Sequence, residues 1–71
     1  MPLIGDDGSE FDWSVTGSTT SGYRGHYLVR RPASRSVEAE ADSQPRKSRE
    51  EAIVWLRFEA RARGFDARGI K

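Results

Sequence analysis

The stretch that decides the fold lies at residues 48–64, which read SREEAIVWLRFEARARG. Ser48 carries a side-chain oxygen of the kind that caps a helix N-terminus, and Glu51, three residues on, completes a capping box. Gly64 stands where a helix ends in a left-handed residue, and an apolar residue follows it, as in a Schellman motif. We therefore predict a helix over Arg49–Arg63.

The predicted helix carries two apolar stripes on nearly opposite sides. At about 100° of rotation per residue, smaller side chains gather on one side and larger ones on the other. The first stripe consists of Ala52, Ile53, Leu56 and Ala60, and the second stripe consists of Val54, Trp55, Phe58 and Ala62. A small sheet covers only one side of a helix, so a folded monomer needs further cover for the other side.

We expect the second stripe to contact a protein, because Trp55 and Phe58 each bring about 150–250 Å² of surface to bury. Arg57 and Arg61 lie beside them, and aromatic anchors with Arg at the rim are typical of interface hot spots. The commonest partner for such a surface is a second copy of the same chain. In the alternative, the chain's own ends wrap the helix through Leu3 and Ile4 or through Phe65 and Ile70, the latter two capping the first stripe.

The sequence before the helix predicts an antiparallel hairpin. In Phe11–Thr16, apolar and polar side chains alternate with the period of a half-buried strand, and a similar pattern returns in Tyr23–Arg31. A small, polar loop bounded by Gly17 and Gly22 separates the two segments, and glycine tolerates the positive φ that a chain reversal needs. The two segments are therefore predicted to pair as strands.

The sequence of residues 36–42 does not decide whether this segment forms a third strand. Their side chains also alternate, but Ala and Glu favour a helix over a strand, and disorder is a further alternative. If the segment pairs with the second strand through a tight turn at 32–35, Glu38 lies near Arg30 and Asp42 near His26. The predicted fold class is α+β, with a small antiparallel sheet of two or three strands, in the order β-β-(β)-α, packed against one C-terminal helix.

The composition bounds the class of protein. The chain has 71 residues, 35% of them hydrophobic, a net charge of +1 and no Cys. Such a chain makes one domain with a small core, and oligomerisation is a common way to stabilise such a domain. Its balanced charge does not by itself indicate a nucleic-acid ligand. Residues 1–10 are predicted to form a flexible leader, and residues 11–71 a single small α+β domain. With neither a signal peptide nor an apolar span, we expect a cytoplasmic protein without a membrane segment.

Catalysis is not expected. The chain lacks Cys, and His26, its only imidazole, lies within a predicted strand. Neighbouring carboxylates such as Glu38 and Glu40 lie in a charge-rich segment, whereas acid-base catalysis needs a carboxyl in a dry cleft. One His cannot supply the ligands of a structural zinc. We therefore predict a homodimeric binding module that is not an enzyme and takes no cofactor, metal or small-molecule substrate.

The alternative function is nucleic-acid binding. The second strand and the start of the helix are rich in Arg, which favours phosphate contacts and base stacking. The residues of this hypothesis are Arg24, Arg30, Arg31, Arg46, Lys47 and Arg49, with Tyr23 and Tyr27 to stack on bases. On the sheet face opposite the helix, however, four acids are predicted to outweigh two Arg, and that balance disfavours phosphate.

The order strand, strand, possible strand, helix resembles the amino-terminal DNA-binding domains of phage integrases and the plant AP2 domain. Glu50, Glu51 and Ala52 match the acidic start of their helix. The resemblance covers this local pattern alone, and it implies DNA as a ligand.

Overall fold

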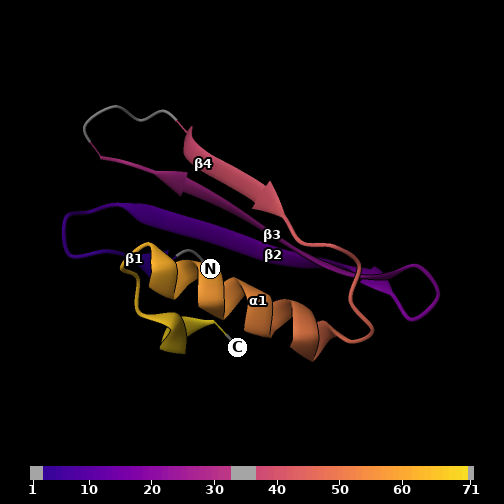
Figure 1. Ribbon diagram of the computed structural model, residues 1–71. Helices are drawn as coiled ribbons and strands as arrows, with labels where there is room; N and C mark the ends of the chain where they lie inside the picture. The colour runs from indigo at the N-terminus through magenta and orange to yellow at the C-terminus, as the bar shows by residue number, and fades with distance from the viewer. Residues whose placement is uncertain (1–2, 33–36, 71) are drawn as a thin grey trace.

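In residues 3–32 and 37–70, which the computed structural model describes, the chain forms an antiparallel sheet with one α-helix across one of its faces (Figure 1). The elements are β1 (Leu3–Ile4), β2 (Glu10–Ser18), β3 (Gly22–Arg30), β4 (Val37–Asp42), α1 (Arg49–Ala62) and the 3-10 helix η1 (Ala67–Gly69). The predicted α+β class is confirmed. In the described part of the chain, no helix is both long and apolar enough to cross a membrane.

The sheet of these residues has four strands, in the order β1-β2-β3-β4, so the prediction of two or three strands is corrected. The additional strand, β1, comes from the segment predicted to be a leader, and it pairs with the start of β2. The chain reverses between them in a turn where the Gly5 N–H donates to the Ser9 carbonyl at 2.8 Å and Gly8 takes a φ of 86°. A strand of two residues has no alternation for a sequence pattern to detect.

β4 forms despite its Ala and Glu content, because pairing with β3 satisfies the backbone polar groups along one of its edges. Its C-terminal end pairs as predicted, with Asp42 opposite His26. At its other end a bulge shifts the register, so that Val37 rather than Glu38 is the partner of Arg30, and the Glu38 side chain bonds to Arg31. The turn predicted at 32–35 lies outside the described residues except for its first position.

α1 begins and ends as its caps predict. The Ser48 side chain accepts a hydrogen bond from the Glu51 N–H at 3.2 Å, and the Glu51 side chain accepts one at 2.9 Å from the Lys47 N–H rather than from the Ser48 N–H of a capping box. At the other end Gly64 takes a φ of 84° and donates to the Arg61 carbonyl at 3.0 Å. The last helical residue lies one position before the predicted end, within the usual fraying of a helix terminus.

The first stripe faces the sheet and forms the core. Its members, Ala52, Ile53, Leu56 and Ala60, are each at most 5% exposed. Ile53, Leu56 and Ala60 belong to the same core cluster as Phe11 and Tyr27, whose rings stack with centroids 4.9 Å apart. Gly25 on β3 allows this close approach, because a Cβ there would lie 2.9 Å from Trp55 Cε3 and 3.0 Å from Leu56 Cγ.

The segment after α1 turns back beside the helix and closes the core (Figure 1). Phe65, Ala67 and Ile70 are buried in the same cluster as the first stripe. The Arg57 Nε–H donates to the Ile70 carbonyl at 2.8 Å, which ties the end of this segment to α1. The C-terminal segment therefore covers the first stripe.

Candidate protein-contact surface

Three members of the second stripe, Val54, Phe58 and Ala62, lie on the exposed side of α1. Phe58 is 68% exposed and Val54 is 61% exposed. Ala62 and the neighbouring Arg61 are exposed as well. Because successive members are four residues apart, Val54, Phe58 and Ala62 form a continuous row along the helix, here called the exposed row. The ends of the chain cover the first stripe and leave this row open.

Trp55 and Arg57 stand at the two borders of the exposed row, and both are half-buried. The Trp55 ring packs against the Tyr27 ring with centroids 5.5 Å apart. Arg57 is held by its bond to the carbonyl of Ile70. Of the six residues predicted for the interface, four are exposed together and these two are partly tied to the core.

A groove of about 610 Å³ runs beside the exposed row over the N-terminal half of α1. It is lined by Arg46, Ser48, Glu50, Glu51, Val54, Trp55 and Phe58. One wall is apolar and belongs to the second stripe, and the other is polar and is formed by the loop that enters α1 together with the first turn of α1. Arg46 and Tyr23 fix this loop by exchanging backbone hydrogen bonds of 2.7 and 2.9 Å. Sequence reasoning missed Arg46 as a groove wall, because only this long-range bridge places it there.

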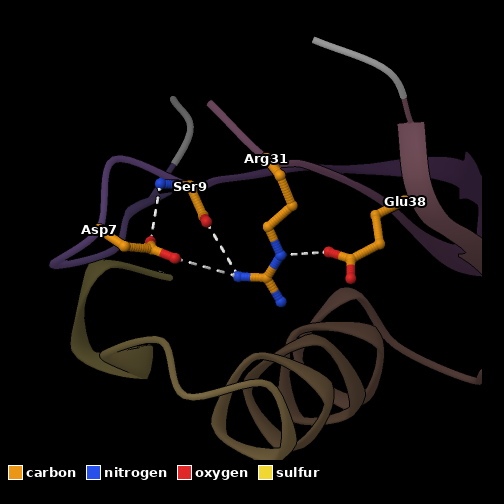
Figure 2. A network of polar contacts seen from close by, with 4 residues as sticks. All are labelled: Asp7, Ser9, Arg31 and Glu38. Carbon is orange, nitrogen blue, oxygen red and sulfur yellow. Dashed lines mark hydrogen bonds and ion pairs between the residues drawn. The ribbon is translucent and has the colours of Figure 1, made fainter. Parts of the chain in front are cut away.

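Figure 2 shows Arg31, a residue of the nucleic-acid hypothesis, among three polar side chains. Its guanidinium bonds to Ser9 Oγ at 2.9 Å, to Asp7 at 3.4 Å and to Glu38. Hydrogen bonds from Ser9, and more weakly the charge of Arg31, hold the pKa of Asp7 below its usual range. The network ties the turn before β2 to the end of β3 and to β4, so Arg31 is engaged within the sheet.

The sheet face opposite α1 carries carboxylates as well as Arg side chains. Arg24 and Arg30 are exposed on β3. His26 lies between two carboxylates of β4, with Nδ1 2.6 Å from Asp42 and Nε2 3.3 Å from Glu40. Carboxylates outnumber Arg on this face, which therefore lacks the excess of positive charge that attracts a phosphate backbone.

The other residues of the nucleic-acid hypothesis lie in separate places. Tyr27 is 1% exposed, burial raises the pKa of its phenol, and its hydroxyl donates to Glu59 at 3.3 Å. Tyr23 is half-buried beside Arg46. The exposed bases at the entry to α1 are Arg46, Lys47 and Arg49. Arg30 lies at the other end of β3 from the loop that enters α1, so it is separated from these bases.

Among the described residues, no group of three or more His, Asp and Glu side chains is placed to hold a metal ion. The chain matches no protein-family model, no curated protein and no solved structure. A proposal of function therefore rests on the geometry of the α1 surface.

Proposed function

We propose that this protein is a small, non-enzymatic binding module that acts through protein-protein contact and forms a homodimer through the second stripe of α1. The observation that carries the proposal is the exposure of Val54 and Phe58 in one row, on a helix whose other side is fully buried. Contiguous apolar surface rimmed by polar side chains is typical of interaction sites. Arg61 and Glu50 supply such a rim at the two ends of the row.

The placement of the titratable groups supports binding over catalysis. Acid-base catalysis needs a group held in a dry cleft with a pKa near the working pH. The carboxylates of the α1 groove, Glu50 and Glu51, are exposed to water. His26 lies on the opposite side of the sheet, between two partly exposed carboxylates.

The size of the surface sets the expected strength of the contact. α1 has 14 residues, and a helix of that length measures about 21 Å. A pair of such helices buries less than the roughly 800 Å² per partner of a standard interface. We therefore expect a dimer that dissociates on dilution.

Light-scattering mass after gel filtration, over a concentration series, tests the proposal. The mass should approach twice 8.0 kDa at high concentration. Phe58→Glu places a charge in the centre of the exposed row and should stay monomeric at every concentration, with an unchanged circular dichroism spectrum. Gln44→Glu adds the same charge on an exposed loop and should leave the dimer intact.

Three results would contradict the proposal. A wild-type chain that is monomeric at all concentrations has no such surface contact. A dimer that survives Phe58→Glu uses another interface. A monomer that elutes with nucleic acid, seen as a raised ultraviolet absorbance ratio that high salt removes, would favour the nucleic-acid alternative.

A further inference from the structure

We infer that the two copies pair with their α1 helices antiparallel, about a two-fold axis between Val54 and Phe58, and that Glu50 of each chain meets Arg61 of the partner subunit. This inference rests on the proposed function. It adds the orientation of the two helices and the charged contact that selects it.

Glu50 and Arg61 lie on the same flank of the exposed row. They are eleven positions apart, and at about 100° per residue this spacing leaves them only about 20° apart around the helix. Both are exposed. None of the ion pairs formed within residues 3–32 and 37–70 includes either of them. One flank of the row therefore presents an acid at its start and a base at its end.

An antiparallel pair brings these opposite charges together. A two-fold axis perpendicular to the helices sets the same flank of both copies face to face and reverses their direction. The axis passes near the level of residue 56, midway between Val54 and Phe58. Glu50 then lies within about one residue, or about 1.5 Å along the helix, of Arg61 of the partner subunit. By symmetry each dimer makes this contact twice.

A parallel pair would bring like charges together instead. Its two-fold axis runs along the helices and sets opposite flanks face to face at the same level. Glu50 would then face Glu51 of the partner subunit, and Arg61 would face only Ala62. The helix dipoles would also align, whereas in the antiparallel pair the positive N-terminal end of each helix lies beside the negative C-terminal end of the other. The charges of α1 therefore favour the antiparallel arrangement.

The groove beside the row fits the same arrangement. It lies over the N-terminal half of α1, and its apolar wall includes Val54 and Trp55. The antiparallel pair lays the C-terminal half of the partner subunit's helix, with its Phe58 and Ala62, over this half. Glu50 lines the groove at the place where the Arg61 charge arrives.

Charge reversal at the two positions tests the orientation. Glu50→Arg and Arg61→Glu should each raise the dimer dissociation constant about tenfold, because each turns two attractive exposed pairs into repulsive ones. The two variants mixed in equal amounts should form a heterodimer with near wild-type affinity, and so should the double variant with itself. Arg24→Glu, on the sheet face opposite α1, changes the net charge as Arg61→Glu does and should leave the dimer unchanged. Sedimentation equilibrium at low salt measures all five.

The outcomes separate this inference from the proposed function. If the wild-type chain is dimeric and the mixture restores what each variant loses, the antiparallel pair is supported. If Phe58→Glu abolishes the dimer but neither Glu50→Arg nor Arg61→Glu changes its dissociation constant, the contact surface is supported and the antiparallel pairing is overturned. If Glu50→Arg strengthens the dimer, the carboxylates face each other and the pairing is parallel. If the wild-type chain never dimerises, both proposals fail.

Discussion

The two stripes of α1 are both apolar, but they differ in exposure. Leu56 in the first stripe is fully buried, whereas Phe58 in the second stripe, a larger side chain two residues on, is 68% exposed. Both belong to one helix and obey one period. The difference lies in what each side meets, which is the sheet and the C-terminal segment on one side and water on the other.

This comparison teaches that hydrophobicity alone does not decide which side chains are buried. A chain of 71 residues has little structure with which to cover a helix. Its sheet covers one side of α1, and Phe65 and Ile70 add to that same side, in one cluster with the first stripe. Apolar surface that the fold does not cover is then available to a partner.

Truncating one residue on each side of α1 gives the largest expected contrast. Leu56→Ala leaves a cavity in the core and is expected to lower the free energy of unfolding by about 2–5 kcal/mol. Val54→Ala removes exposed atoms and is expected to change it by less than about 0.5 kcal/mol. Urea unfolding followed by tryptophan fluorescence, on protein dilute enough to be monomeric, measures both. Equal losses would mean that the second stripe is covered within the monomer.

Crowding the contact between the first stripe and the sheet is expected to have a smaller effect. Gly25→Ala places a Cβ within 2.9 Å of Trp55 and 3.2 Å of the Ala52 carbonyl, so α1 must shift, at a cost of about 1–3 kcal/mol. Ser14→Ala, on the exposed face of the neighbouring strand β2, is the matched control and should be nearly neutral. The urea midpoints of the two variants measure the difference. A neutral Gly25→Ala would mean that α1 is not seated on β3 as described.

The smallest expected effect concerns the segment that covers the first stripe. Arg68 hydrogen-bonds to Asp66 and lowers the pKa of this carboxyl to about 2. Because the lowered pKa belongs to the folded chain, this contact stabilises the fold above pH 3.8, the ordinary pKa of the group, and the contribution is lost as the pH falls toward 2. Both side chains are exposed, so the change in stability is slight. An NMR titration of Asp66 should give a midpoint near 2 in the wild type and a higher one in Arg68→Gln. Equal midpoints would show that the contact does not form.

Local signals allowed most of the fold to be predicted. Ser48, Glu51 and Gly64 mark the ends of α1 because caps act within a few residues of themselves. The alternation of apolar and polar side chains in β2 and β3 indicates half-buried strands, because neighbouring side chains of a strand point to opposite faces of the sheet. β1 and the bulge that pairs Glu38 with Arg31 could not be predicted, because each depends on a turn or a register that only the assembled sheet defines.

The candidate surface was predicted in part. The helical period placed Val54, Phe58 and Ala62 in one row, and the structure shows that row exposed. In the structure Arg57 also donates a hydrogen bond to the carbonyl of Ile70, and this contact depends on where the C-terminal segment packs. The groove wall at Arg46 depends on a backbone bridge to Tyr23, which is distant in the sequence.

The sequence by itself determined that α1 forms and that it has two apolar sides, because hydrogen bonding, capping and the helical period act over a few residues. Only the tertiary structure decided which side becomes the core. The physical reason is that burial depends on the area of sheet and tail that the whole chain can bring to one place, and this chain brings both to the first stripe.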